Sequence, residues 1–274
     1  MKIGFIGTGN MGAAIIRTIR DMDGLKLFGL NRTRSTLEKL AAETGLVPCA
    51  DVRELTEISD YIVLAVKPQQ AQEVWPEMLP ALTKGKCLIS IAAGLTLNEL
   101  KNNSNSICPV VRVMPNTTVL IREGVTAVCF DDPALTEEQK QVVKDVFRFL
   151  GDVHALPERQ FDAFTAVIGS GPAYIFYLIE AMIEAAVEIG LDRNMSSFMV
   201  KKLFSGASLL AYGSKEHISI LKDMSTAPAG TTVAGLAHFD RTALRGNIID
   251  AIRKAFDRSI EMGRGMNPQD SKGV

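Results

Sequence analysis

Lys2-Ile3-Gly4-Phe5-Ile6-Gly7-Thr8-Gly9-Asn10-Met11-Gly12 is the stretch that decides the fold of this chain. Its first five residues form a short apolar run that predicts a buried strand, and the pattern Gly-x-Gly-x-x-Gly follows at once. Ala13 to Arg20 then reads as a helix. The glycine pattern alone is weak evidence, because an ordinary glycine-rich turn produces it too. A strand before it and a helix after it indicate a dinucleotide site.

The three glycines of the pattern are expected to have different roles. Gly7 permits the tight turn, Gly9 lets a pyrophosphate approach the backbone, and Gly12 lets the helix pack closely on the strand. The N-terminus of the helix presents free N–H groups and the positive end of its dipole to the phosphates.

Composition narrows the class of protein. The chain has 274 residues, 47% of them hydrophobic, which is enough for a large core in one long or two medium domains. Its net charge is −1 and it lacks a block rich in Lys and Arg, so nucleic acid is not an expected partner. We expect no membrane span, because no apolar run reaches about 18 residues. Lys2 leads straight into the first strand without a signal segment, so a cytoplasmic location is expected.

The four cysteines are Cys49, Cys87, Cys108 and Cys129. None are close enough for a Cys-x-x-Cys motif, and three lie in or beside apolar, strand-like runs. Buried free thiols are therefore expected, rather than a metal site or a redox pair.

The second apolar run, from Leu25 to Leu30, ends at Asn31-Arg32-Thr33-Arg34. NAD-binding folds usually carry Asp or Glu at this place, where the carboxylate binds the ribose 2′-hydroxyl. A carboxylate would repel a 2′-phosphate, whereas an arginine binds one. Asn31 and the two arginines therefore favour NADPH, with NADH as the alternative cofactor. A solvated loop that happens to be basic is the other interpretation.

Further alternating strands and helices predict a doubly wound, mostly parallel sheet in an α/β Rossmann-type domain, residues 1–157. Ser35 is expected to cap a helix that runs to Thr44, and Thr136 to open a later one. The predicted strands run Asp60–Val66, Leu88–Gly94, Val110–Met114, Gly124–Phe130 and Asp152–Leu156. The first of them ends at Lys67-Pro68. The second ends in small residues, which either leave room for a nicotinamide or simply form a tight turn.

No convincing strand pattern occurs after Arg159, and we predict that residues 158–274 form an all-α domain. The expected helical segments are Phe161–Ile189, interrupted at Gly169–Pro172, then Asn194–Tyr212, Ile218–Met224, Thr231–Phe239 and Ala243–Met262. These helices are apolar around most of their circumference, and so small a domain cannot bury that surface alone. We therefore expect an intertwined homodimer.

Ala227-Pro228-Ala229-Gly230-Thr231-Thr232 lies between two of these helices. Pro and Gly predict a tight loop, and Thr231-Thr232 open a helix whose N-terminus is suited to a carboxylate. An ordinary helix cap is the alternative interpretation.

With this loop in view, the chain resembles pyrroline-5-carboxylate reductases along essentially its full length. Several motifs occur in the family's order, which is more specific than any one of them. They are Ile3–Gly12, Leu64–Gln69, Ser90–Gly94, Val111–Thr117, Gly169–Tyr174 and Pro228–Thr232. The resemblance implies reduction of 1-pyrroline-5-carboxylate to L-proline with NAD(P)H, the last step of proline biosynthesis. It also implies a helical dimerisation domain and rings of dimers, often decamers.

The resemblance gives roles to matching positions. It implies that the cofactor is held by Gly7, Thr8, Gly9, Asn10, Met11, Gly12, Asn31, Arg32, Thr33, Ala65, Val66, Lys67, Pro68, Ala92, Ala93 and Gly94. The substrate and its carboxylate are implied to meet Met114, Asn116, Ala229, Gly230, Thr231 and Thr232. Thr232 matches the family threonine that contacts the carboxylate and orients the imine, and the loop is supplied across the dimer.

Four positions in three places depart from the family. Its loop usually reads Ser-Pro-Gly-Gly, so Ala227 lacks a hydroxyl and Ala229 reaches positive φ less cheaply than glycine. Thr118 stands where the family generally has proline, and Val52 where it often has asparagine. None removes a group that the chemistry requires.

The chemistry demands little acid–base machinery. The cofactor carries the hydride, and water or an incoming iminium supplies the proton, so the scattered His154, His217 and His238 are expected to be non-catalytic. A 3-hydroxyisobutyrate-type dehydrogenase needs a lysine where this chain has Ile175. An imine reductase with another cyclic substrate, and a non-catalytic NADP-binding scaffold or sensor, remain as alternatives because the loop has changed.

Overall fold

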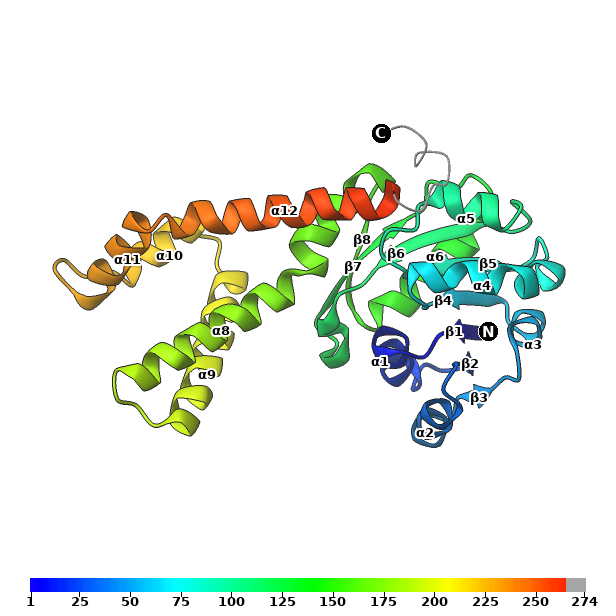
Figure 1. Cartoon of the computed structure of the whole chain (residues 1–274), viewed down its shortest axis with the longest axis horizontal. Helices are drawn as coiled ribbons and strands as arrows, with labels where there is room; N and C mark the ends of the chain where they lie inside the picture. Colours follow the sequence, from blue (N-terminus) through cyan, green and yellow to red (C-terminus); the bar gives the residue numbers. More distant parts are fainter. Residues whose placement is uncertain (265–274) are drawn as a thin grey trace. The chain divides into compact units, whose positions relative to one another are not determined.

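The structure is a computed structural model that describes residues 1–264. The chain divides into two compact units. The Rossmann unit comprises Met1–Ser170 and the chain from Ala255 onward, and the helical unit is Gly171–Lys254 (Figure 1). Each unit has its own arrangement of elements. The predicted domains, 1–157 and 158–274, stay a prediction.

One eight-stranded sheet forms the centre of the Rossmann unit, in the order β3-β2-β1-β4-β5-β6-β7-β8. The strands are β1 Lys2–Ile6, β2 Lys26–Leu30, β3 Val47–Pro48, β4 Tyr61–Leu64, β5 Cys87–Ser90, β6 Val110–Met114, β7 Gly124–Cys129 and β8 Gly151–Ala155. All neighbouring pairs are parallel except β6 with β7. The predicted doubly wound, mostly parallel sheet is confirmed. The order in which the strands are added reverses between β1 and β4.

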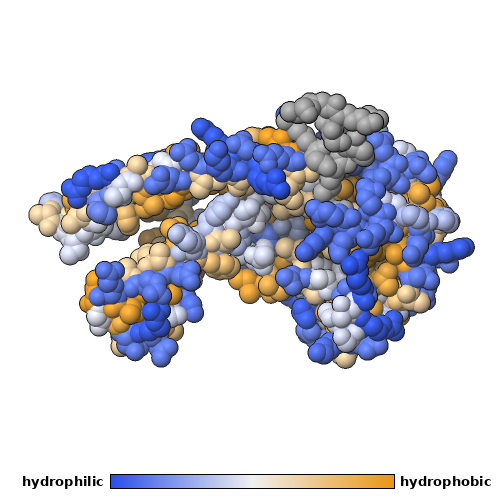
Figure 2. Space-filling model, in the orientation of Figure 1, coloured by the Kyte–Doolittle hydropathy of each residue, from blue (hydrophilic) through white to orange (hydrophobic). Residues whose placement is uncertain are grey.

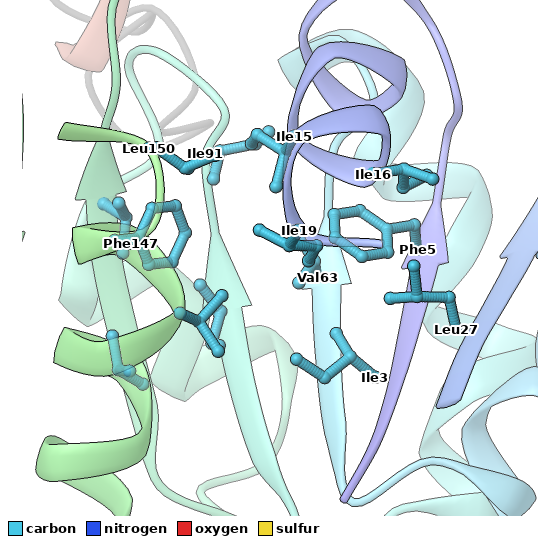
Figure 3. Packing of buried hydrophobic residues seen from close by; sticks show 14 of the residues in the cluster. Ile3, Phe5, Ile15, Ile16, Ile19, Leu27, Val63, Ile91, Phe147 and Leu150 are labelled. Atoms are coloured by element: carbon cyan, nitrogen blue, oxygen red, sulfur yellow. The ribbon is translucent and has the colours of Figure 1, made fainter. Parts of the chain in front are cut away.

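Apolar side chains on the two faces of this sheet form two cores. Ile3 and Phe5 of β1 pack on one face, and Ile6 packs on the other. Figure 3 shows the first core, where Ile15, Ile16 and Ile19 lie over the strands. A sheet buried on both faces explains the near-continuous apolar runs of its strands.

The described part of the Rossmann unit contains the helices α1 Asn10–Ile19, α2 Arg34–Thr44, α3 Val52–Ile58, α4 Pro68–Met78, α5 Leu97–Asn103, α6 Glu137–Arg148 and the short α7 Phe161–Phe164, with the last part of α12 Leu244–Arg264. Shorter turns are η1 Leu79–Ala81, η2 Thr117–Ile121, η3 Glu158–Gln160 and η4 Thr165–Gly169. Thr136 caps α6 through a capping box with Gln139, as expected. The cap assigned to Ser35 is wrong, since α2 begins at Arg34 and Thr33 precedes it.

The helical unit contains α8 Gly171–Glu188, α9 Arg193–Gly213, α10 Ile218–Met224, α11 Thr231–Arg241 and the first part of α12 Leu244–Arg264. The predicted absence of strands here holds for residues 158–264. Large apolar side chains are exposed, among them Phe176 at 62%, Tyr177 at 72% and Leu209 at 67%. Figure 2 shows hydrophobic surface over α8 and α9. This surface is what the homodimer prediction required.

The same surface corrects one expectation from the sequence. Among the described residues, the helical run Glu158–Glu188 is long and apolar enough to cross a membrane, and only 6% of its apolar window is buried. Counting uninterrupted apolar residues missed it, because a few polar residues divide the run. Length and composition therefore do not exclude a span here. An exposed dimerisation helix has the same composition, so the observation is weak evidence for a membrane.

Candidate functional site

The glycine turn after β1 has the geometry that its sequence predicts. Gly7 has φ of 96°, and its N–H donates to the Leu30 carbonyl at 2.9 Å. A β-carbon at Gly12 would lie 2.4 Å from the Gly7 carbonyl oxygen, so α1 packs directly on the turn. A β-carbon at Gly9 would meet no atom within 4 Å. The backbone at Gly9 is therefore open to an approaching ligand.

A cleft of about 700 Å³ opens beside this turn, at the carboxyl ends of β1, β2 and β4. Nine of the predicted cofactor residues line it: Gly7, Gly9, Asn10, Met11, Asn31, Arg32, Ala65, Val66 and Lys67. In an open parallel sheet, ligands bind at this edge, where the strand order reverses. The sequence therefore singled out nine residues that lie together around one cleft.

The N-terminus of α1 fits a dinucleotide phosphate. Gly9 precedes the helix and has no side chain to cap it, and no acidic residue stands in the first turn. The N–H groups at Asn10 and Met11 begin α1 and border the cleft. Unsatisfied N–H groups and the positive dipole end together favour an anion at this point.

Arg32 lies at the end of β2 in the cleft, as predicted. Its Nη2 contacts Glu73 Oε2 of α4 at 2.9 Å, and both side chains are largely exposed. Arg34 does not line the cleft; its Nε bonds Glu38 on the same helix at 3.1 Å. Of the two arginines used to argue for a 2′-phosphate, Arg32 lines the cleft and Arg34 does not.

The other predicted cofactor residues lie beside the cleft lining. Thr33 immediately precedes α2, Pro68 is the first residue of α4 and Gly12 is buried in α1. The Thr8 hydroxyl is buried without a hydrogen-bond partner among the described residues. Ala92 is buried and Ala93 follows it in the turn after β5. Gly94 has φ of 87°, and a β-carbon there would lie 3.4 Å from Met262 Cβ of α12.

One face of α4 lines the cleft and was missed in the sequence. Gln70, Glu73, Val74 and Glu77 recur every three or four residues and all contribute. This helical spacing was the available signal, but Pro68 was interpreted as a strand stop rather than as the start of a helix. Asp51 and Val52 also line the cleft. Val52, one of the positions that differ from the resembled family, therefore borders the cleft in which the cofactor is expected.

Two predicted substrate residues lie at the end of β6 in the Rossmann unit: Met114 is its last residue, and Asn116 follows it. Asn116 is 7% exposed, and its Oδ1 accepts from Val125 N at 3.1 Å and from Thr118 Oγ1 at 2.7 Å. Its Nδ2 donates to the Ile168 carbonyl at 3.4 Å. Asn116 thus ties the loop after β6 to β7 and η4. Met114 packs against Gly169, where a β-carbon would lie 2.8 Å from its Cε.

The remaining predicted substrate residues, Ala229–Thr232, lie in a turn and at the start of the helix that follows it, in the helical unit. Gly230 N donates to the Ala227 carbonyl at 3.1 Å, with Pro228 and Ala229 between them. Ala229 has φ of 58°, in the left-handed region that favours glycine. Proline at the second position and a left-handed residue at the third are typical of a type II turn. Ala229 therefore adopts a backbone conformation that glycine adopts at lower cost.

Thr231 and Thr232 begin α11 directly after this turn. Gly230 precedes the helix, and no side chain caps its first turn. Both threonines are exposed. The turn and the helix N-terminus together offer backbone N–H groups and two hydroxyls, which suits a carboxylate.

The cysteines are buried free thiols, as predicted. Burial raises the pKa of Cys49 and of Cys108 to about 11 and that of Cys129 to about 12. Their thiols are therefore protonated and unreactive at neutral pH. No group of three or more His, Cys, Asp or Glu with metal-site spacing occurs among the residues that the structure describes.

Two family models match separate parts of the chain. A family model described as pyrroline-5-carboxylate reductase dimerisation matches residues 158–262. One described as NADP oxidoreductase coenzyme F420-dependent matches residues 2–94.

Individual relatives agree as well. Pyrroline-5-carboxylate reductase of Methanosarcina acetivorans is 34% identical, over 96% of this chain and 98% of the relative. The Escherichia coli enzyme is 32% identical over the same shares. The crystal structure of Plasmodium falciparum pyrroline carboxylate reductase with NADP bound superposes with a TM-score of 0.88, at 32% identity, covering 96% of this chain and 98% of that one.

Proposed function

The chain belongs to the pyrroline-5-carboxylate reductase family, and on that premise we propose which of its residues hold the cofactor and which hold the substrate. The activity is that of an NADP-dependent oxidoreductase acting on a CH–NH group. It reduces the cyclic imine 1-pyrroline-5-carboxylate to L-proline, the last step of proline biosynthesis.

The cofactor half of the site is assigned to the cleft beside β1. Gly7 to Gly12 and the N-terminus of α1 hold the pyrophosphate, and Asn31, Arg32 and Thr33 meet the adenosine ribose and its 2′-phosphate. Ala65–Pro68 and Ala92–Gly94 flank the nicotinamide half. NADPH, when bound, supplies the hydride. The observation that carries this assignment is the glycine turn opening onto a cleft that contains Arg32.

The substrate half is assigned to Ala229–Thr232, with Met114 and Asn116 from the Rossmann unit. Backbone N–H groups at the start of α11 and the Thr232 hydroxyl hold the substrate carboxylate. Asn116 acts mainly by fixing the loop after β6, because its carbonyl oxygen already accepts two hydrogen bonds. Thr232 is the one residue proposed as catalytic, since it orients the imine.

Holding and orienting account for most of the catalysis. The imine carbon must lie against the reacting carbon of the cofactor, and a well-oriented pair gains up to about 7–11 kcal/mol over free encounter. The ring nitrogen takes its proton from water or arrives protonated, so no dedicated acid is assigned.

The Ala229 turn favours this reaction over its two rivals. An imine reductase for another cyclic substrate, or a non-catalytic NADP-binding sensor, was suggested by Ala227 and Ala229. Ala229 nonetheless keeps the left-handed conformation that the glycine of the family loop adopts easily. Retaining that conformation despite its strain supports an unchanged carboxylate site.

Assembly and location are also part of the proposal. The dimerisation domain supports a homodimer through the helical unit, with the substrate loop supplied across the dimer. A ring of dimers such as a decamer, a cytoplasmic location and the absence of nucleic-acid and membrane partners are proposed with it. Buried free thiols support a reducing compartment.

Kinetics of Thr232→Ala test the substrate half. We expect a higher KM for pyrroline-5-carboxylate and a lower kcat, while the Kd for NADPH is preserved. Thr242→Ala, at the other end of α11, is the matched control and should leave all three constants unchanged. Unchanged kinetics in Thr232→Ala would remove Thr232 as a substrate ligand.

A further inference from the structure

Arg32 and Glu73 form an ion pair inside the cofactor cleft. The Arg32 guanidinium is the group assigned to the 2′-phosphate, and the Glu73 carboxylate lies 2.9 Å from it. A phosphate that contacts Arg32 must therefore compete with Glu73 for the same guanidinium, or share it.

Glu73 lies on α4, which keeps its carboxylate close to Arg32. Gln70, Glu73, Val74 and Glu77 form the face of α4 that lines the cleft, so Glu73 is held on a helix rather than on a flexible loop. Arg34 does not line the cleft, and its guanidinium bonds Glu38 on the same helix. The other cationic side chain in the lining is Lys67.

We propose that Glu73 is a specificity-determining residue that weakens binding of the 2′-phosphate and so sets the ratio of NADPH to NADH affinity. Glu73 weakens NADPH binding in two ways. It occupies Arg32 in the free protein, and it repels the phosphate in the complex. NADH carries a neutral 2′-hydroxyl in place of the phosphate, and the Glu73 carboxylate does not repel it. The effect of Glu73 therefore falls mainly on NADPH. This inference rests on the proposed role of Arg32.

The size of the effect follows from exposure. Arg32 and Glu73 have 71% and 69% exposed side chains, so solvent and salt screen the pair. Exposed pairs of this kind change an equilibrium by up to about fivefold. Since the repulsion of the phosphate adds to this, we expect Glu73→Gln to lower the Kd of NADPH by about threefold to tenfold at low salt.

Direct binding of NADPH and NADH to the full-length protein tests the proposal. Glu73→Gln keeps the shape of the side chain and removes its charge. Glu38→Gln is the matched control, because it breaks another largely exposed Arg–Glu pair, which Arg34 forms outside the cleft only two residues after Arg32. We expect tighter NADPH binding in Glu73→Gln only, NADH binding within about twofold, and a difference that shrinks as salt rises.

Three outcomes would overturn the proposal. NADPH binding in Glu73→Gln is unchanged or weaker, which would mean that Glu73 does not compete or that it orients Arg32 for the phosphate. NADH binding tightens equally, or Glu38→Gln has the same effect, which would indicate a general charge effect.

A third variant, Arg32→Ala, separates this inference from the proposed function. A selective loss of NADPH affinity in Arg32→Ala upholds Arg32 as the phosphate ligand, even where Glu73→Gln has no effect. No change in Arg32→Ala contradicts both the role of Arg32 and the competition by Glu73.

Discussion

The carbonyl oxygen of Gly7 occupies the place where residue 12 would carry a β-carbon, at a separation of only 2.4 Å. Gly12→Ala must push α1 away from the turn, because the obstacle is backbone. We expect a loss of about 3 kcal/mol in the free energy of unfolding and a loss of NADPH binding. Urea unfolding and fluorescence titration measure the two effects.

Gly9→Ala should separate binding from folding, because a β-carbon there meets no protein atom within 4 Å. Stability should fall by no more than about 1 kcal/mol, the range for a weaker helix cap. NADPH should bind at least tenfold more weakly, since the new methyl group enters the space assigned to the pyrophosphate. Unaltered NADPH affinity in Gly9→Ala would move the pyrophosphate away from this turn.

Ala229→Gly should stabilise the protein, in contrast to most substitutions by glycine. Ala229 has φ of 58°, where a β-carbon is strained and glycine is not. We expect about 1 kcal/mol more stability, since relief of strain exceeds the added freedom of the unfolded chain. Thermal unfolding monitors this, with Ala227→Gly in the same turn as a control that should destabilise. A lower melting temperature for Ala229→Gly would contradict the observed conformation.

Glu158 holds the Arg112 guanidinium and the start of α5 together. Its Oε1 accepts from Arg112 Nη1 at 3.0 Å and from Leu97 N at 2.7 Å, and Arg112 also lies over the Phe161 ring. Glu158→Ala leaves a guanidinium that is 7% exposed without its carboxylate, so we expect a loss of about 3 kcal/mol.

Two further variants check that assignment by denaturant unfolding. Adding Arg112→Met to Glu158→Ala should recover part of the lost stability, because the buried charge is gone. Glu57→Ala breaks the exposed pair with Arg53 and should cost less than about 1 kcal/mol. Equal losses in Glu57→Ala and Glu158→Ala would show that burial of Arg112 is unimportant.

Asp132 should contribute acid sensitivity. Burial raises its pKa, but hydrogen bonds from Val110 N, Lys101 Nζ and Ala134 N outweigh this and hold the pKa below its ordinary 3.8. The stabilisation is present above the unfolded pKa and is lost as pH falls through the folded one. Asp132→Asn should therefore be less stable near neutral pH, with a smaller further loss below about pH 4. Parallel stability–pH curves for both proteins would contradict this.

The sequence predicted those helices and strands that a short, continuous residue pattern marks. It missed α4 and the direction in which the side chains of α4 point. β1 and β6 were predicted to the residue, because each is an apolar run bounded by a turn. α4 was missed because Pro68 ends an apolar run as readily as it begins a helix, and Pro76 lies inside the element. The cleft face of α4, with Glu73, was missed with it.

The site shows the same division. The backbone geometry of the glycine turn was predicted correctly at Gly7, Gly9 and Gly12, because the local sequence pattern alone decides it. Arg32 and Arg34 looked equivalent in the sequence. They differ in the structure because Arg34 is already part of α2, where Glu38 lies one turn away and pairs with it. Adjacency along a chain does not say which side chain enters a cleft.

The most direct measurement is turnover of NADPH with 1-pyrroline-5-carboxylate by the purified full-length protein, with L-proline quantified as product. The account predicts one L-proline formed for each NADPH oxidised, and strongly reduced turnover in Thr232→Ala with the Kd for NADPH unchanged. Tight NADPH binding without turnover would contradict it in favour of a sensor. Turnover only with a different cyclic imine would contradict the assigned substrate.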